Sequence, residues 1–227
     1  MSFKHILLYY CLCVFTGCDV IDKIKNKPFN NEKQKLFIVA SKQEVDINKF
    51  EIKKQIDNNT YLTDIGYILY SGVGKIKTTY SLTKFLTLYK ENISEIYNIG
   101  TAGATENNKF GDIVECNTFI QNDAEDFLKK DIITKTNTHL KENNDYTCLT
   151  TDSFITTKQD KGKIIFEMEA YASAKVADNF NMLDKFYAIK FVSDIVGNDN
   201  NIEKWDNNAE ILNNKLVNKI KEIANKK

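Results

Sequence analysis

The sequence predicts a single α/β domain in which short apolar strands alternate with helices. Wholly apolar runs recur between polar stretches, and segments with helical spacing lie between them. The chain has 227 residues, of which 42% are hydrophobic, and this is enough for one domain with a sizeable core. We find no internal repeat and no second domain in the sequence.

The spacing of the apolar residues predicts each element in turn. Residues 36–40 are wholly apolar, as expected of a central buried strand. Residues 61–70 predict a further strand or hairpin arm, and residues 78–88 have helical periodicity. Residues 123–147 are polar and poorly patterned. The other expected elements are strands at residues 93–99, 113–120, 163–166 and 186–192, and helices at residues 170–180 and 204–226.

Two glycine-containing segments follow expected strands. Residues 71–74 are Ser-Gly-Val-Gly, and residues 100–103 are Gly-Thr-Ala-Gly. Backbone N–H groups in such segments can bind a phosphate at the start of a helix. However, neither segment has the spacing of a P-loop or of a dinucleotide-binding fingerprint. The simpler interpretation is that both are tight strand-to-helix turns.

The composition excludes several classes of function. The chain has 31 basic and 31 acidic residues, so it has no net charge to indicate nucleic-acid binding. All of these basic residues are lysines. The two histidines are too few to predict a histidine-based metal site. Cys116 and Cys148 do not predict a disulfide framework, and the apolar stretch around Cys116 favours a buried core position.

The first residues have the pattern of an export signal. A short basic start precedes an apolar run at residues 6–15 that is too short to span a bilayer. The run is followed by Thr16-Gly17-Cys18, which resembles a bacterial lipobox and predicts a lipid anchor on Cys18 at the cell envelope. An ordinary signal peptide or a hydrophobic first helix would make this cysteine incidental, and a chain without export would be cytoplasmic. The expected divisions are a signal peptide at 1–17, a lipid-anchored tether at 18–34 and a domain at 35–227.

Acidic side chains follow two of the expected strands. Glu167-Met168-Glu169 comes directly after the strand at 163–166, and Ser193-Asp194 comes directly after the strand at 186–192. Open α/β sheets bind ligands at the carboxyl ends of their strands. One crevice could therefore collect both groups.

Together with other segments, these motifs resemble those of the 5′-methylthioadenosine/S-adenosylhomocysteine nucleosidases, within the purine nucleoside phosphorylase superfamily. The resemblance runs from about residue 35 to the C-terminus and keeps the family's order. It implies a central mixed twisted sheet flanked by helices, and hydrolysis of 5′-methylthioadenosine, S-adenosylhomocysteine or 5′-deoxyadenosine to adenine without a metal or cofactor. The matching segments are Ile38-Val39-Ala40-Ser41-Lys42-Gln43-Glu44-Val45, Ser71-Gly72-Val73-Gly74-Lys75, Asn98-Ile99-Gly100-Thr101-Ala102-Gly103, Gly111-Asp112-Ile113-Val114, Asp152-Ser153-Phe154-Ile155, Glu167-Met168-Glu169-Ala170 and Val192-Ser193-Asp194.

The resemblance also implies roles for individual residues. Asp194 would be the general acid that protonates adenine, and Glu44 would activate the attacking water. Glu169 would bind the ribose hydroxyls, with Met168 beneath the sugar and Glu167 holding the loop. The other implied substrate-binding residues are Thr101 near the water, Phe154 stacked on adenine, Ile155 bonding the base edge through its backbone, and Ser193.

Each of these residues also has an ordinary explanation. Asp194 could cap the turn at Gly197, and Met168 and Phe154 could fill the core. A lone glutamate such as Glu44 is usually solvated surface charge. The functional roles therefore depend on the motifs occurring together.

Two other functions stay open at this stage. The chain could be a surface lipoprotein that keeps the fold as a binding module, or a purine nucleoside phosphorylase. The lack of arginine argues against a phosphorylase, because phosphorolytic relatives clamp phosphate with arginines and here Lys190 stands where many relatives carry one. Residues 125–146 are fewer than in the usual nucleosidase, where an inserted loop contacts a second subunit, so a homodimer is an open expectation.

Overall fold

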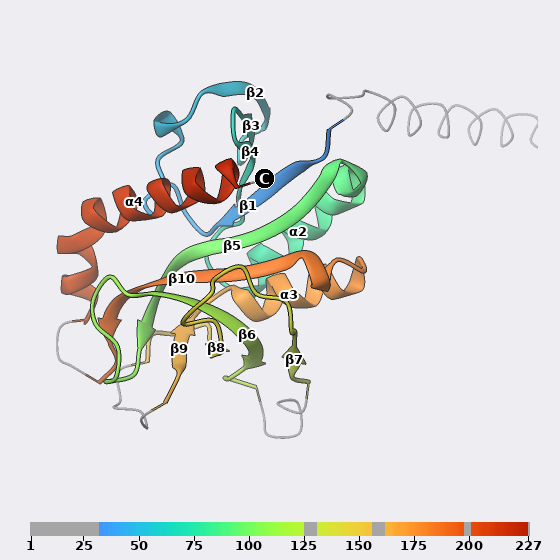
Figure 1. Ribbon diagram of the computed structural model, residues 1–227. Coiled ribbons are helices and arrows are strands. Elements are labelled where there is room, and N and C mark those ends of the chain that lie inside the picture. Colours follow the sequence, from blue (N-terminus) through green and yellow to red (C-terminus); the bar gives the residue numbers. More distant parts are fainter. Residues whose placement is uncertain (1–31, 125–130, 156–161, 198–200, 227) are drawn as a thin grey trace, which may run out of the picture.

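The computed structural model describes residues 32–124, 131–155, 162–197 and 201–226. A ten-stranded sheet forms the centre of the molecule (Figure 1). Its strands are β1 (Gln34–Val39), β2 (Ile52–Asp57), β3 (Thr60–Thr63), β4 (Gly66–Tyr70), β5 (Ile93–Ala104), β6 (Ile113–Gln121), β7 (Ile133–Thr134), β8 (Tyr146–Thr150), β9 (Ile164–Glu167) and β10 (Phe186–Ile195). They are ordered β10-β6-β8-β9-β5-β1-β4-β3-β2, and β7 pairs with β6.

The sheet is mixed, as the family resemblance of the sequence implies. β4, β1, β5 and β10 are parallel neighbours, whereas β6 is antiparallel to β10 and β9 is antiparallel to β5. β10 pairs with both β5 and β6, and β8 joins β6 to β9, so these five strands close into a ring. Because β1, β5 and β10 are parallel, their carboxyl ends lie at the same edge of the sheet.

Among the described residues, three helices cover the two faces of the sheet. α2 (Lys75–Tyr89) and α3 (Ala170–Asn179) lie on one face, and α4 (Asn201–Asn225) crosses the other (Figure 1). Single turns of 3-10 helix connect other elements: η1 (Ile47–Lys49), η2 (Lys90–Asn92) and η3 (Leu183–Lys185).

β1 illustrates why both faces must be covered. Successive side chains of a strand point to opposite faces of the sheet. Leu36 and Ile38 belong to the hydrophobic cluster that contains Leu82 of α2, whereas Phe37 and Val39 belong to the cluster that contains residues of α4. A strand buried on both faces has a continuous apolar sequence, and for this reason the run at 36–40 predicts it.

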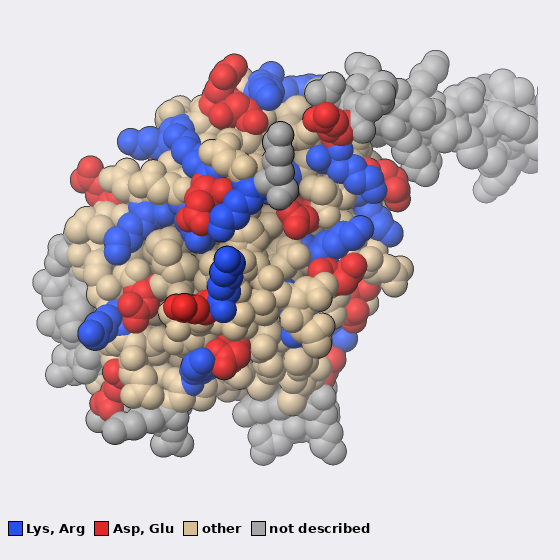
Figure 2. Space-filling view, viewed as in Figure 1, with Lys and Arg blue, Asp and Glu red and all other residues tan. Residues whose placement is uncertain are grey.

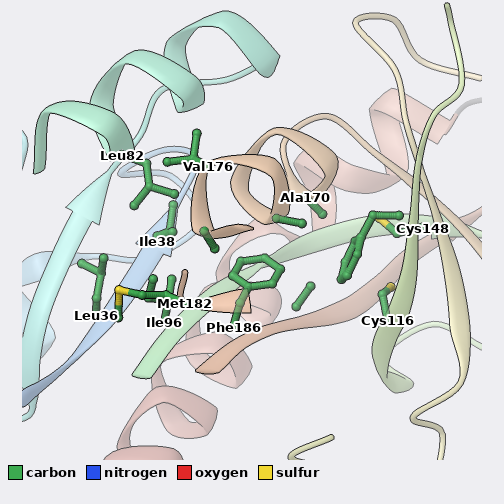
Figure 3. Packing of buried hydrophobic residues seen from close by; sticks show 14 of the residues in the cluster. Leu36, Ile38, Leu82, Ile96, Cys116, Cys148, Ala170, Val176, Met182 and Phe186 are labelled. Atoms are coloured by element: carbon green, nitrogen blue, oxygen red, sulfur yellow. The ribbon is translucent and has the colours of Figure 1, made fainter. Parts of the chain in front are cut away.

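The core beneath α2 and α3 is continuous across the sheet. In Figure 3, Leu82 and Val176 of the two helices lie near Ile38, and the cluster continues past Phe186 to the two cysteines. Cys116 and Cys148 are both buried and free. The predicted core position of Cys116 is therefore confirmed.

The surface has interspersed charges. On the face covered by α4, lysine and acidic side chains alternate over short distances (Figure 2). This distribution fits the zero formal net charge of the chain. Within the described part of the chain, no helix is both long enough and apolar enough to cross a membrane.

The prediction of a turn at residues 100–103 is wrong. β5 continues through both glycines to Ala104 and pairs with β10 over this stretch, with Gly100 opposite Lys190 and Ala104 opposite Ile195. By contrast, residues 71–74 do form a turn into α2, where Gly72 and Gly74 have φ values of 84° and 95°. The parallel partner strand, which a local pattern cannot reveal, keeps β5 extended.

The polar region at 123–147 also contains structure that its pattern does not predict. β7 and the start of β8 lie within it, and the hairpin arm expected at 61–70 is two strands, β3 and β4. β2, which follows η1, has mostly exposed residues and gives no apolar signal. Edge strands such as β2 and β7 are covered on fewer sides than β1, so their sequences are less apolar.

Candidate active site

Four carboxyl groups lie around the last residues of β5. Glu44 follows β1, Glu167 and Glu169 lie at the end of β9, and Asp194 lies near the end of β10. The sheet order places β1, β9 and β10 next to β5. The structure therefore places beside β5 the acids after β9 and β10, which the sequence predicts to lie together, and also Glu44, which the family resemblance assigns to the site.

Glu44 is bound to β5 through one of its two carboxylate oxygens. Oε1 accepts hydrogen bonds from the backbone N–H of Thr101 at 2.9 Å and from the Thr101 hydroxyl at 3.0 Å. Oε2 is buried and accepts no hydrogen bond from the described residues. A Cβ at Gly100 would lie 3.0 Å from Oε1, so glycine permits this close approach. Glu44 is thus fixed in place and keeps one oxygen available.

Glu167 forms a buried ion pair with Lys190 of β10. The Lys190 Nζ lies 3.0 Å from Glu167 Oε2, and each side chain is at most 2% exposed. Burial opposes the charged form of Glu167, but Lys190 and hydrogen bonds from Thr150 and the backbone outweigh it, so the pKa of Glu167 is lowered. Burial also opposes the charge on Lys190, but the neighbouring carboxylates raise its pKa.

Glu167 also fixes the turn between β9 and α3. Its Oε2 accepts the N–H groups of Glu169 at 2.8 Å and Ala170 at 2.7 Å, and its Oε1 accepts the Thr150 hydroxyl at 2.5 Å. With this many donors, the carboxylate has little capacity left for a ligand. Glu167 is therefore suited to hold the loop that presents Met168 and Glu169.

Glu169 is a buried carboxyl group with an environment opposite to that of Glu167. Its Oε1 accepts the backbone N–H of Gly74 at 2.8 Å. Burial and the charges of Glu167 and Glu44 raise the pKa of Glu169 to about 8, against the opposing effects of Lys190 and the Gly74 N–H. Two adjacent acids thus differ in protonation at neutral pH, because only Glu167 pairs directly with the lysine.

Asp194 approaches β5 from the neighbouring strand β10. It pairs in register with Gly103, and a Cβ at Gly103 would lie 3.1 Å from Asp194 Oδ2. The hydroxyl of Ser193 lies 2.7 Å from Asp194 Oδ1 and 3.2 Å from the carbonyl oxygen of Ala102. Because this hydroxyl has a single proton, it can donate to only one of these oxygens at a time.

The remaining predicted residues lie at the ends of β8 and β9. Phe154 follows β8, and its side chain is 65% exposed, so it does not have the core position of an ordinary phenylalanine. Ile155 and Met168 are each partly buried. An exposed aromatic side chain is available to stack on a planar base.

Three groups contribute to the site although the sequence gives them no role in it. They are the Lys190 ammonium, the Thr150 hydroxyl and the Gly74 N–H, which bind Glu167 or Glu169. Lys190 had a detectable signal, because a lysine within an apolar strand is almost always paired. The other two are visible only once the turns are placed in space. In the part of the chain that the structure describes, no group of His, Cys, Asp and Glu residues is arranged to hold a metal ion.

The fold is that of the 5′-methylthioadenosine/S-adenosylhomocysteine nucleosidases, as the sequence predicts. The Helicobacter pylori enzyme solved with butyl-thio-DADMe-Immucillin-A is 14% identical to this chain with a TM-score of 0.68, and the match covers 86% of this chain and 98% of that one. A Borrelia burgdorferi protein described as such a nucleosidase, bound to adenine, is 22% identical with a TM-score of 0.67, over 84% and 98% of the two chains.

Another similar structure has a different function. Futalosine hydrolase of Helicobacter pylori is 16% identical with a TM-score of 0.65, and the match covers 84% of this chain and 97% of that chain. No family model and no curated protein matches the sequence. At these identities the similarity shows the fold, and the activity must be argued from the site itself.

Proposed function

We propose that the protein hydrolyses the N-glycosidic bond of 5′-modified adenine nucleosides, namely 5′-methylthioadenosine, S-adenosylhomocysteine or 5′-deoxyadenosine. The observation that carries the proposal is the convergence of Glu44, Glu169 and Asp194 around the end of β5. Neighbours with this fold are named as nucleosidases, and one of them is bound to adenine, which supports adenine as the base.

The three acids match the three tasks of the reaction. Asp194 donates a proton to N7 of adenine, and the electrons of the C1′–N9 bond leave with the base. Water then adds to C1′, and the free oxygen of Glu44 takes its proton. The products are adenine and the free 5′-modified ribose. Glu169, beside the partly buried Met168, binds the ribose hydroxyls.

Water rather than phosphate is the proposed nucleophile. The chain has no arginine, and Lys190, the buried cation of the site, is already paired with Glu167. A phosphate ion would need a free cation or a fork of donors. We therefore expect the protein to release adenine from 5′-methylthioadenosine at the same rate with and without phosphate, as measured by chromatography of adenine and the sugar product.

This experiment separates the three functions considered for the chain. A rate that rises with phosphate, together with a ribose-1-phosphate product, would identify a phosphorylase. Binding of adenine without release from any of the three nucleosides would identify a binding module. Hydrolysis of futalosine, and of none of the three adenine nucleosides, would indicate the activity named for the similar futalosine hydrolase.

The raised pKa of Glu169 predicts a pH-dependent effect of Glu169→Gln on stability. Between the ordinary glutamate pKa of about 4.3 and a folded-state pKa of about 8, the folded protein keeps a proton that the unfolded chain has lost. Wild-type stability therefore falls as the pH rises through this window. Glutamine does not titrate, so the melting temperature of the variant should equal that of the wild type below about pH 4 and exceed it by roughly 5 °C above pH 8.

Two further measurements make this prediction specific. Glu91→Gln changes an exposed glutamate and is the control for this substitution. Glu169→Gln should also weaken nucleoside binding above about pH 8, where Glu169 is ionised, because an amide accepts fewer hydrogen bonds from the ribose than a carboxylate does. A melting-temperature difference that does not change between pH 4 and pH 8 would contradict the proposed burial of a protonated Glu169.

We propose that the partner of this chain in solution is a second copy bound through α2. Val73, Ile76, Tyr80 and Leu88 are exposed on α2 and its entry turn, with Ile76 at 83%. Ile76 and Tyr80 line a groove of about 750 Å³ between α2 and α3, and Lys75, next to the Gly74 contact of Glu169, lines it as well. Apolar surface of this kind usually marks an interface. Sedimentation equilibrium should show a dimer that Tyr80→Glu converts to a monomer.

We also propose that the protein is anchored to a membrane of the cell envelope through a lipid on Cys18. Residues 1–31 lie outside the described residues, so this proposal is supported by the sequence motif alone. Protein from its native cell should partition into detergent, and Cys18→Ala should abolish partitioning without reducing adenine release by the 35–227 domain. Recovery of the native protein with Met1 still present would instead place it in the cytoplasm.

A further inference from the structure

The start of α2 is bound by carboxylates from two other segments. The N-cap residue Gly74 provides no capping side chain. The N–H of Gly74 donates to Glu169 Oε1 at 2.8 Å, and the N–H of Lys75 donates to Asp152 Oδ1 at 3.3 Å. Carboxylates are favoured at a helix N-terminus because its N–H groups are unsatisfied and its dipole is positive there. Consecutive N–H groups therefore contact one acid after β9 and one acid after β8.

The side chain of Lys75 closes a compact cluster on the same segment. Its Nζ lies 2.6 Å and 2.5 Å from the two carboxylate oxygens of Asp123, and 3.0 Å from Asp152 Oδ2. The N–H of Asp152 donates to Asp123 Oδ2 at 2.8 Å, so all three residues are joined to one another. The Lys75 side chain is only 12% exposed.

Lys75 balances part of the negative charge of Asp123 and Asp152 in this cluster. Partial burial of Asp123 opposes its ionisation, but hydrogen bonds from Lys75 and the Asp152 N–H outweigh this and lower the pKa of Asp123. The backbone N–H of Asp152 brings the Asp123 carboxylate close to the Asp152 carboxylate, and without the lysine these two charges would repel each other. Lys75 is therefore the group that makes the close approach of Asp123 to Asp152 favourable.

Asp152 is the first residue of the segment assigned to the base. Phe154 and Ile155 come after Ser153 in this segment, and the proposed function assigns them to the face and the edge of adenine. Thr151, just before it, is fixed by donation of its N–H to the Glu167 carbonyl oxygen at 2.9 Å. This segment is therefore bound to β9 through Thr151 and to the start of α2 through Asp152. The start of α2 also binds, through the Gly74 N–H, the carboxyl group of Glu169 that is assigned to the ribose.

We propose that Lys75 is a positioning residue that, through Asp152 and Asp123, holds the adenine-binding segment 152–155 at a fixed distance from the ribose-binding Glu169. This inference depends on the proposed function for the identity of the ligand. The Lys75 ammonium does not contact the reacting atoms. Its removal should therefore weaken binding of the base and leave the chemical step largely unchanged.

The experiment compares Lys75→Met with a matched variant of the same helix. Lys84 is also on α2, and its ion pair with Asp57 at 3.3 Å is exposed, so Lys84→Met is the control. Lys75→Met should weaken adenine binding in calorimetry by ~10-fold and raise KM for 5′-methylthioadenosine by a similar factor, with kcat changed by less than ~3-fold. Lys84→Met should match the wild type, and Lys75→Arg should recover most of the lost affinity because it keeps the charge.

Hydrogen exchange of the ligand-free protein tests the positioning role of Lys75 without relying on the activity. Peptides that contain residues 152–155 should exchange faster in Lys75→Met than in Lys84→Met. Adenine affinity and exchange equal to the wild type in folded Lys75→Met would overturn the proposal. If Lys75→Met does not fold, Asp123→Asn must weaken adenine binding in the same direction, or the proposal fails. If the wild type neither binds nor releases adenine, the proposed function fails. Faster exchange of residues 152–155 in Lys75→Met would then still support the positioning role of Lys75.

Discussion

Asp194→Asn is expected to slow adenine release by ~100-fold or more through the loss of the general acid. The departing base develops negative charge as the C1′–N9 bond breaks, and an amide cannot donate the proton that neutralises it. The substitution preserves shape, and this matters because Asp194 lies close to β5, where a Cβ added at Gly103 would be 3.1 Å from Oδ2. Single-turnover measurement of adenine release separates this effect on chemistry from any effect on product release.

The neighbouring serine provides the matched control for this substitution. Ser193→Ala removes the hydroxyl that lies 2.7 Å from Asp194 Oδ1 but keeps the carboxyl group. We expect it to slow release by ~10-fold at most, because it removes one hydrogen bond and not the acid. Turnover of Asp194→Asn at a rate near that of the wild type, with the melting temperature unchanged, would remove Asp194 from the reaction.

The sequence predicts most of the central sheet because its strands are buried on both faces. β1 and β10 have nearly continuous apolar sequences. The glycines at 100 and 103 mislead a prediction from local sequence, since glycine weakens the interior of a strand. Here they remain in β5 because β10 pairs with them in parallel and because Glu44 and Asp194 approach their bare Cα atoms.

The acidic residues of the candidate site can be predicted from the sequence, but the contacts that they make cannot. The positions of Glu167, Glu169 and Asp194 after apolar strands predict that they share a sheet edge. The sequence cannot show that Lys190 forms its ion pair with Glu167 and not with Glu169, because this pair depends on a 3.0 Å contact between two strands. For the same reason it cannot join Lys75 to Asp123 and Asp152, which come from three separate segments.

Glu44→Gln is expected to reduce the rate of hydrolysis by ~100-fold or more, because the base that activates water is lost. In the wild type, Thr101 occupies Oε1, and Oε2 accepts no hydrogen bond from the described residues. Glutamine can keep the Thr101 contacts through its amide oxygen, but it then presents an NH₂ group to the water and cannot take a proton. Adenine affinity should be unchanged, since the base is assigned to the segment at 152–155.

Glu44→Gln has a second expected effect, on the pKa of Glu169. A purely structural role for Glu44 would not produce both this effect and the loss of rate. The charge of Glu44 contributes to the raised pKa of Glu169, so its removal should lower that pKa from about 8. Nucleoside binding by Glu44→Gln should therefore reach its full strength at a lower pH than in the wild type. Thr101→Val, which keeps the Thr101 N–H and the Glu44 carboxylate, should lose ~10-fold in rate without this pH shift. Wild-type hydrolysis by folded Glu44→Gln would require another residue to activate the water.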